Sequence, residues 1–228
     1  MEKRLEEYIK LEKLFSNKGY KLYLVGGTVR DYLLGLSLDD MDVVTDATPS
    51  EIKSFLPGAD YTFERYGSVS IKTNKEVKFD ITTLRVEEGY VDSRHPGSIK
   101  FVKDLELDVK RRDFTINGLY MDKDLKIYDF VGGVNDINNK VLRMIGDPNK
   151  RLKEDPLRIL RAFRFASDFS LTIDKDLDLA IRNNISELDK LNKEKIKMDL
   201  KKTSSKKKNE LMRYFEEYGI KHLKDVIE

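Results

Sequence analysis

The sequence predicts an α+β fold, with strands and helices mixed in the first part of the chain and helices alone in the second. An apolar run at residues 22–25 ends at two glycines, which is typical of a strand that enters a turn. Apolar and polar residues alternate over residues 77–81, which indicates a half-buried strand. Turn-forming residues 146–149 then separate this part from a helical pattern. We therefore expect one domain over residues 1–145 and a second over 146–228.

The turn at Gly26 and Gly27 is the first candidate binding element. A helical pattern with Val29, Leu33 and Leu34 on one face follows it. Glycine lets the backbone approach a ligand closely, and the start of a helix offers N–H groups and a positive dipole end to an anion. The pattern therefore suits a phosphate group, and the alternative is an ordinary strand-to-helix turn that binds nothing.

Asp40 and Asp42 are the second candidate element, because they precede Val43 and Val44 in a segment that is typical of a strand. Side chains two positions apart in a strand point to the same face, about 6–7 Å from one another. Carboxylates at that spacing suit Mg²⁺, which prefers carboxylate, phosphate and water oxygens. In the alternative interpretation these residues are solvated turn positions or helix caps.

Asp80 is a candidate third carboxylate, on the polar face of the alternating strand. If that strand neighbours the one that bears Asp40 and Asp42, three acids converge on the metal ions and one of them could take a proton from an attacking hydroxyl. The alternative is a surface aspartate beside Lys78.

These residues carry a resemblance to a known family. Gly26–Asp31 followed by Asp40–Asp42 resembles the head domain of the nucleotidyltransferase superfamily, in the branch of class II tRNA CCA-adding enzymes and bacterial poly(A) polymerases. Its later motifs B, C and D are matched in order by Arg111–Gly118, Tyr128–Gly133 and Glu154–Phe165. The resemblance spans roughly residues 20 to 200 and implies a polymerase-beta-like head with a mixed sheet and flanking helices, followed by an all-α neck.

The resemblance also implies roles for residues of the first part. It places in the nucleotide site Gly26, Gly27, Arg30, Arg112, Asp113 and Asn117. Arg112 would contact the triphosphate, and Asp113 and Asn117 would hold the sugar. Arg111 and Arg112 could each grip phosphate oxygens with two parallel hydrogen bonds, which a lysine cannot do. For Arg111 the alternative is an exposed basic residue on a loop.

Motif D places Arg158, Arg161 and Arg164 at intervals of three along a predicted helix, as a stripe on one flank. A stripe of this kind suits a nucleobase edge or a phosphate, and the alternative is a solvated helix face. Asp155 before Pro156 is also typical of a helix N-cap.

By resemblance, Asp155 and Arg158 act as an amino-acid template for the incoming base. Cytosine and adenine each present an amino donor beside a ring-nitrogen acceptor, which a carboxylate and a guanidinium can satisfy together. Uracil and guanine present a carbonyl oxygen in place of the amino group, which would leave a polar group unpaired at a cost of about 1–3 kcal/mol. We therefore expect CTP and ATP to be selected without a nucleic-acid template.

Residues 87–98 contain turn-forming residues and no regular spacing of apolar residues, so we expect a mobile loop. In the family the corresponding loop helps to change the pocket from cytosine to adenine addition. Its full length here favours CCA or A addition.

The leading prediction is a Mg²⁺-dependent enzyme that adds CMP and AMP to the 3′ end of tRNA. Asp40 and Asp42 are the predicted metal ligands, and Asp40, Asp42 and Asp80 are the predicted catalytic carboxylates. The alternatives are an A-adding enzyme or a poly(A) polymerase, and, from another class, a non-catalytic RNA-binding subunit. Eight lysines between residues 193 and 208 could follow an RNA backbone or form a solvated linker.

Composition predicts a cytoplasmic protein without a membrane segment. The 228 residues include no cysteine, carry a net charge of +2 and contain no apolar run long enough to span a bilayer. Family members usually continue into body and tail domains that hold tRNA. We therefore expect a truncated chain, a naturally minimal enzyme, or one that obtains the missing tRNA-binding surface as a homodimer or from a partner chain.

Overall fold

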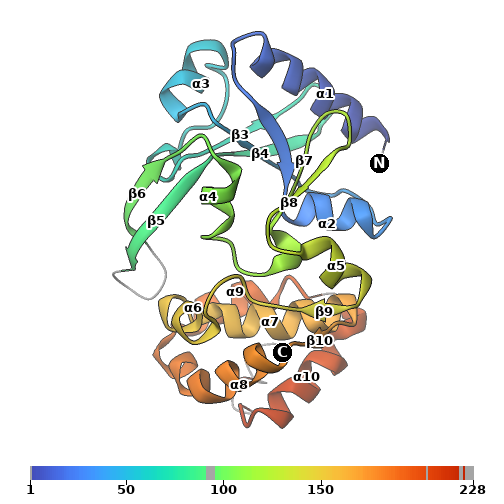
Figure 1. Cartoon of the computed structure of the whole chain (residues 1–228), viewed down its shortest axis with the longest axis vertical. Coiled ribbons are helices and arrows are strands. Elements are labelled where there is room, and N and C mark those ends of the chain that lie inside the picture. The colour runs from blue at the N-terminus through green and yellow to red at the C-terminus, as the bar shows by residue number, and fades with distance from the viewer. Residues whose placement is uncertain (1, 91–95, 204, 221–222, 224–228) are drawn as a thin grey trace. The chain divides into compact units, whose positions relative to one another are not determined.

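The computed structural model describes residues 2–90, 96–203, 205–220 and 223. The chain forms two compact units. Unit 1 comprises Met1–Gly89 and Pro96–Val134, and unit 2 comprises Tyr90–His95 and Asn135–Glu228. Figure 1 labels the helices and strands of both units.

The elements follow one another in an order that mixes strands and helices early and becomes mainly helical later. Their bounds are α1 (Glu2–Ser16), β1 (Leu22–Val25), α2 (Gly27–Leu33), β2 (Met41–Thr45), α3 (Pro49–Phe55), η1 (Glu64–Tyr66), β3 (Ser68–Lys72), β4 (Lys78–Thr83), β5 (Arg85–Tyr90), β6 (Pro96–Phe101), α4 (Leu105–Val109), η2 (Thr115–Asn117), β7 (Leu119–Met121), β8 (Ile127–Asp129), α5 (Gly133–Asn138), β9 (Val141–Leu142), α6 (Pro148–Glu154), α7 (Leu157–Phe169), β10 (Thr172–Ile173), α8 (Lys175–Asn184), η3 (Ile185–Lys190), α9 (Lys193–Leu200), η4 (Ser205–Lys207) and α10 (Lys208–Glu217).

Unit 1 is built on a six-stranded sheet with the strand order β3-β4-β2-β1-β7-β8. Strand β2 runs parallel to β4, and the other neighbouring strands are antiparallel, so the predicted mixed sheet is confirmed. The predicted strand at Leu22–Val25 is β1, and the predicted alternation over residues 77–81 appears as buried Val77, Phe79 and Ile81.

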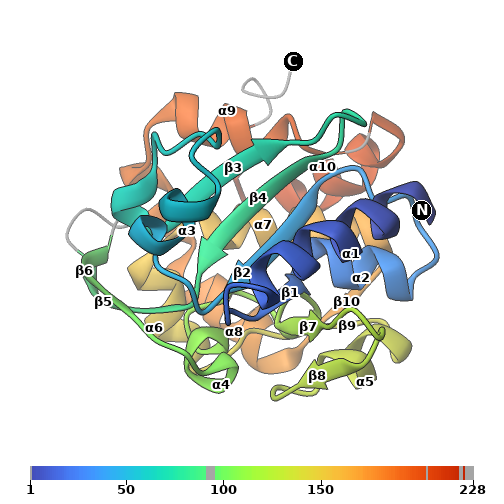
Figure 2. The ribbon, with the colours of Figure 1, turned by 90° about the horizontal axis from the view of Figure 1, so that it is seen from above.

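Helices α1 and α3 lie over one face of this sheet (Figure 2). Tyr8 of α1 is buried and donates its hydroxyl to the carbonyl oxygen of Leu22 at 2.9 Å. The ring of Phe15, also in α1, meets Phe55 of α3 edge to face, with ring centroids 5.1 Å apart. Burial of these large apolar side chains against the strands stabilises the unit.

The prediction of a mobile loop over residues 87–98 is wrong where the structure describes it. Strands β5 and β6 pair with one another as a separate two-stranded sheet. Pairing between two segments of extended backbone does not need a regular apolar period, which explains why the pattern was missed. Residues 91–95 lie outside the described part of the chain.

Unit 2 is mainly helical. Its central helix is α7, in which Ile159, Leu160 and Phe163 are fully buried, as their spacing predicts. The all-helical prediction is wrong at Thr172–Ile173, because this short strand pairs in parallel with Val141–Leu142. Two residues are too few to produce a period in the sequence.

The lysine-rich segment is ordered as helix and not as a linker over most of its described residues. The segment forms α9, η4 and the start of α10. Among the helices in the described part of the chain, none is long and apolar enough to cross a membrane.

Candidate nucleotide and metal site

Two of the predicted carboxylates lie on neighbouring strands. Asp42 of β2 and Asp80 of β4 are direct partners in the parallel register. The next pair along the same strands, Val43 and Ile81, is fully buried on the opposite face, because side chains alternate across a sheet. The adjacency that the sequence could not show is therefore present.

Asp40 differs from its prediction, because β2 begins at Met41 and Asp40 lies just before the strand with its side chain exposed. The buried hydroxyl of Thr28 fixes this segment. It donates to the carbonyl oxygen of Asp40 at 3.1 Å and accepts from the backbone N–H of Asp42 at 2.9 Å. Thr28 was not among the predicted site residues, and its position directly after the two glycines was the available signal.

The environment of Asp42 suits a cation. Burial raises the pKa of its carboxyl to about 6, and the negative charges of Asp80 and Asp40 act in the same direction. The Asp80 carboxylate also forms a salt bridge with Lys78 at 2.9 Å. This contact fits the alternative interpretation, in which Asp80 is a surface aspartate beside Lys78.

The three acids do not gather into one cluster. Within the ranges that the structure describes, no group of three or more His, Cys, Asp or Glu side chains is arranged to hold a metal ion. Magnesium usually takes one or two protein carboxylates and completes its shell with water and substrate phosphates, so the pair of Asp42 and Asp80 on neighbouring strands would be enough for it.

The turn between β1 and α2 has the geometry that glycine permits. Gly26 has φ +62°, a conformation that strains other residues. A Cβ atom on Gly26 would lie 3.7 Å from Nη1 of Arg112 and 3.7 Å from the carbonyl oxygen of Asn117. The turn therefore packs directly against motif B.

The helix after this turn is shorter and less apolar than predicted. Val29 is fully buried, but Leu33 and Leu34 are 36% and 40% exposed. The helix ends at Leu33, so only its first turn is enclosed by the rest of unit 1, and its core-facing side contains Thr28 and Arg30 as well.

Three predicted nucleotide-site residues form one hydrogen-bonded chain. Nη1 of Arg30 donates to Oδ1 of Asn117 at 2.7 Å, and Nδ2 of Asn117 donates to Oδ1 of Asp113 at 3.2 Å. Asp113 also accepts from the backbone N–H of Phe114 at 2.8 Å. The structure thus joins the Gly-Gly motif to motif B through residues 87 positions apart in the chain.

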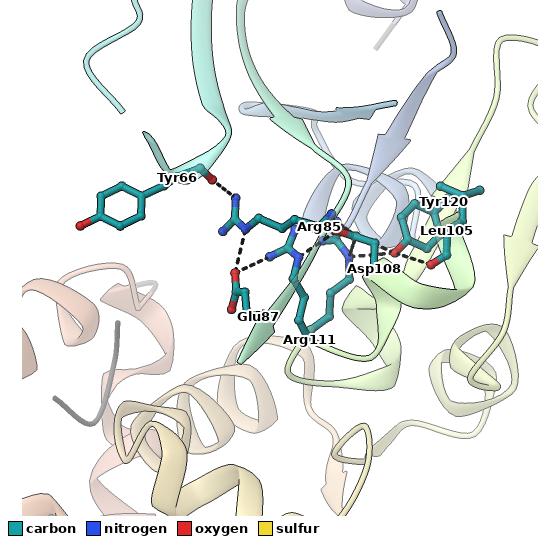
Figure 3. A network of polar contacts seen from close by, with 8 residues as sticks. Tyr66, Arg85, Glu87, Leu105, Asp108, Arg111 and Tyr120 are labelled. Atoms are coloured by element: carbon teal, nitrogen blue, oxygen red, sulfur yellow. Dashed lines mark hydrogen bonds and ion pairs between the residues drawn. The ribbon is translucent and has the colours of Figure 1, made fainter. Parts of the chain in front are cut away.

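Both arginines of motif B bind one buried carboxylate that the sequence analysis missed. Asp108 of α4 accepts from Nε of Arg111 at 2.8 Å and from Nη2 of Arg112 at 2.9 Å (Figure 3). Burial alone would raise the pKa of Asp108, but the charges of Arg112 and Arg111 hold it well below its usual range. The spacing i, i+3 and i+4 was the signal that could have identified it.

Motif C forms a tight hydrogen-bonded turn in unit 1. The carboxylate of Asp129 accepts four backbone N–H groups, from Val131, Gly132, Gly133 and Val134. A Cβ atom on Gly133 would lie only 2.2 Å from the carbonyl oxygen of Thr115, so this position requires glycine. Motif C therefore packs against η2, the segment that carries Asn117.

The predicted residues of motif D lie in unit 2. Oδ1 of Asp155 accepts from the backbone N–H of Leu157 at 3.1 Å. The N-cap prediction for Asp155 is wrong, because Asp155 is the C-cap of α6 and Pro156 is the N-cap of α7. Arg158 is buried and donates to the carbonyl oxygen of Arg151 at 2.6 Å.

The arginine stripe is not a solvated face. Arg164 is buried, with Nε 3.6 Å from Oδ2 of Asp199 in α9, and Arg161 lies over the ring of Phe165 at 5.3 Å. The side chains of Arg158 and Arg164 thus contribute to the packing of unit 2.

An open cavity of about 430 Å³ also lies on unit 1. Its lining includes Tyr23, Lys103 and Tyr128, and none of the predicted site residues. The predicted site is a set of polar side chains along the sheet and the Gly26 turn, outside this cavity.

A mixed sheet with paired carboxylates, next to a glycine turn that packs against arginines, has the fold of a nucleotidyltransferase head. The chain belongs to the family described as the poly A polymerase head domain, whose model matches residues 22–143, more than half of its length.

Named relatives agree with this family. The chain is 41% identical over 190 residues to a CCA-adding enzyme of Staphylococcus epidermidis. The matched residues cover 83% of this chain and 47% of the relative. The chain spans about half the length of the curated relatives that it matches.

Solved structures share the fold. The Bacillus stearothermophilus CCA-adding enzyme in complex with CTP matches with a TM-score of 0.80 and 32% identity, over 88% of this chain and 48% of that one. A tRNA nucleotidyltransferase with a primer tRNA and an incoming ATP analog matches with a TM-score of 0.75 and 27% identity, over 95% of this chain and 62% of that one.

Proposed function

We propose that this chain carries the catalytic centre of an enzyme that adds CMP and AMP to the 3′ end of tRNA without a template, as in CCA addition or repair. The observation that carries the proposal is the register pairing of Asp42 with Asp80, in the unit where Arg30 and Arg112 surround the Gly26 turn. The matched relatives support it, because they are CCA-adding enzymes and one of the matched structures holds CTP.

The reaction is a nucleotidyl transfer. The 3′-hydroxyl oxygen of the RNA attacks the α-phosphorus of CTP or ATP, the bond to the β-phosphate breaks, and pyrophosphate leaves. Asp80 accepts the proton of the attacking hydroxyl. Arg112 binds triphosphate oxygens through its forked guanidinium, and Asp113 and Asn117, already joined by a hydrogen bond, hold the sugar.

Asp40 and Asp42 are the proposed ligands of two Mg²⁺ ions. When bound, the ions would neutralise phosphate charge and stabilise the attacking and leaving oxygens of an in-line displacement. The raised pKa of Asp42 supports this assignment, because a carboxyl that ionises reluctantly beside Asp80 is stabilised in its charged form by a bound cation.

Base selection belongs to motif D in this proposal. Asp155 and Arg158 pair with the amino group and ring nitrogen of cytosine or adenine, and Arg161 and Arg164 are further nucleotide-binding residues of the same motif. The hydrogen bond from the backbone N–H of Leu157 to Oδ1 of Asp155 supports a fixed orientation of this carboxylate.

We also propose that the catalytic head comprises residues 1–145 and the helical neck residues 146–228. The family model supports this boundary, because its match ends at residue 143, whereas the compact units divide earlier, between Val134 and Asn135. The reaction would take place in the cytoplasm, where tRNA and nucleoside triphosphates meet.

The test uses purified protein with Mg²⁺ and three tRNAs that end before CCA, after the first C and after CC. Each receives CTP, ATP or both, and product length is read at single-nucleotide resolution. Extension by three nucleotides followed by arrest is the expected result. The Asp42→Ala variant should lose both extension and metal-dependent CTP binding.

Other results would identify the alternatives. Growth only from the CC end would indicate an A-adding enzyme, and long A tails would indicate a poly(A) polymerase. RNA binding without extension would refute catalysis by this chain alone, and would indicate an RNA-binding subunit or a need for a second copy or a partner chain that completes the tRNA-binding surface.

A further inference from the structure

The carboxylate of Asp108 is the centre of a polar network inside unit 1 (Figure 3). It is completely buried, and donors from four residues reach it. These are the backbone N–H of Arg85 at 3.1 Å, Nε of Arg111 at 2.8 Å, Nε and Nη2 of Arg112 at 3.1 and 2.9 Å, and the hydroxyl of Tyr120 at 2.9 Å. Burying a carboxylate costs free energy unless it is paired, and Asp108 accepts hydrogen bonds from all four of these residues.

Two nitrogens of Arg112 contact the same oxygen of Asp108. The third nitrogen, Nη1, lies on the side of the Gly26 turn, where a Cβ atom would be 3.7 Å away. Because the guanidinium is planar, holding its Nε and Nη2 edge sets the direction of Nη1. The hydroxyl of Tyr120 adds a second hold, since it accepts from Nε of Arg112 at 3.1 Å.

The network also reaches the two-stranded sheet formed by β5 and β6. Glu87 of β5 accepts from Nε of Arg85 at 2.8 Å and forms a 3.4 Å ion pair with Arg111. Arg111 therefore bridges Glu87 and Asp108, while Arg112 is the arginine that lies against the turn. This division of contacts gives the two adjacent arginines different tasks.

We propose that Asp108 is a positioning residue, which holds the guanidinium of Arg112 against the Gly26 turn in the orientation that binds the triphosphate. The inference rests on the proposed function, in which Arg112 contacts the nucleotide. Asp108 itself touches neither nucleotide nor metal, and it acts through Arg112. Arg111, held by both Asp108 and Glu87, completes the support and does not contact the nucleotide.

The first experiment measures CTP binding at equilibrium and steady-state addition to tRNA with Asp108→Asn, which keeps the shape and removes the charge. We expect affinity for CTP to fall, and KM for CTP to rise, by about tenfold to a hundredfold, which is the usual effect of losing a partner that orients a ligand-binding group. KM for tRNA should stay unchanged.

Asp104→Ala is the matched control. Asp104 caps the same helix α4 by accepting the N–H of Glu106 at 2.8 Å. Its loss weakens α4 without removing a contact to Arg112, so KM for CTP should remain near that of the unmodified protein. An equal rise in KM for both variants would show that Asp108 only supports the helix, and would overturn the proposal.

A double-mutant cycle with Arg112→Lys tests whether Asp108 acts through Arg112. Lysine keeps the charge and removes the fork, so Asp108→Asn should have little further effect in that background. Additive losses would overturn the proposal. If Asp108→Asn does not fold, Tyr120→Phe takes its place, because it removes only the hydroxyl that bridges Asp108 and Arg112, and it should raise KM for CTP severalfold.

The two proposals fail in different ways. Unmodified protein that neither binds CTP nor extends RNA would overturn the proposed function and this inference with it. Unmodified protein that binds CTP, with affinity unchanged in Asp108→Asn, would overturn only the role of Asp108.

Discussion

At the scale of single residues, Asp42 shows how a site can oppose the stability of its own fold. Its side chain is half-buried next to Asp80, and the pKa of its carboxyl is raised to about 6. The native protein must therefore hold an unfavourable charge at neutral pH unless a cation neutralises it. A position selected for stability alone would carry a neutral residue.

The Asp42→Asn variant should be more stable than the unmodified protein at pH 7 in the presence of a chelator. A shift of about two pKa units corresponds to roughly 3 kcal/mol in the free energy of unfolding, or about 6–12 °C in Tm for a chain of this size. The same variant should lose nucleotide addition. Thermal unfolding and the tRNA extension assay measure the two effects.

The stabilisation should depend on pH with a defined sign. The folded pKa of Asp42 lies above the unfolded value, so the native state binds a proton first as the pH falls from about 6 to about 4. The gain of Asp42→Asn should be complete above pH 6 and absent below about pH 4. Asp40→Asn is the comparison, since it removes only the weaker of the two negative charges that raise the pKa of Asp42, so its gain should be smaller than that of Asp42→Asn.

Gly133 is a second residue whose identity follows from a contact. Gly133→Ala would place a Cβ atom 2.2 Å from a backbone oxygen of Thr115, and backbone cannot move aside cheaply. We expect a loss of about 1–3 kcal/mol in urea unfolding, together with weaker nucleotide binding through η2.

The neighbouring Gly132 is the matched control for this clash. It has φ +78° and nothing within 4 Å of its added Cβ, so Gly132→Ala should cost only the strain of a left-handed backbone, about 1 kcal/mol. Equal losses for the two variants would show that the contact with Thr115 is not tight in solution.

At the scale of elements, the site depends on how α2 is joined to the start of β2. The hydroxyl of Thr28 makes both hydrogen bonds of this junction, to Asp40 and to Asp42. It therefore sets the position of the two proposed metal ligands relative to the Gly26 turn.

Thr28→Val should weaken the junction between α2 and β2, although the valine side chain has nearly the same shape as that of threonine. It leaves the N–H of Asp42 and the carbonyl of Asp40 without their partner, at a cost of about 1–3 kcal/mol. The Mg²⁺ concentration that gives half-maximal activity should rise. Thr28→Ser keeps the hydroxyl and should restore most of both properties; if it behaves like Thr28→Val, packing of the methyl group and not hydrogen bonding is responsible.

At the scale of the whole molecule, charge is distributed unevenly. The chain carries a net charge of only +2, but lysines concentrate along α9, η4 and the start of α10. Lys201 and Lys202 are exposed. An exposed cationic surface attracts an RNA backbone in a salt-dependent way, because binding releases counterions.

Replacing Lys201 and Lys202 with glutamine should weaken RNA binding for all sequences alike. The slope of log affinity against log salt should decrease by about 1–2, if both side chains neutralise phosphates. Binding titrations at several salt concentrations measure it. The control changes Lys13 and Lys18, which are exposed on unit 1, and an equal loss there would show that only the total charge matters.

Prediction from sequence succeeded where the signal is local. The strand at Leu22–Val25, the alternation around Asp80 and the buried face of α7 all follow from periodicity over a few residues. It failed at β5 and β6, which pair with one another without an apolar period, and at Thr172–Ile173, which is too short to show one.

The sequence by itself determined the family motifs and predicted which residues carry the chemistry, because carboxylates, arginines and glycines at fixed spacing are properties of the chain alone. Only the tertiary structure decided that Asp42 and Asp80 are register partners, that Arg30 reaches Asn117 and that Asp108 holds Arg112. The first two contacts join residues far apart in the chain, and the third, four residues apart, depends on how the short helix α4 packs. The first two follow from the order of strands in the sheet and the packing of the segments around it, which no local pattern encodes. For the third, the i, i+4 spacing is local, and only the burial of Asp108 needed the tertiary structure.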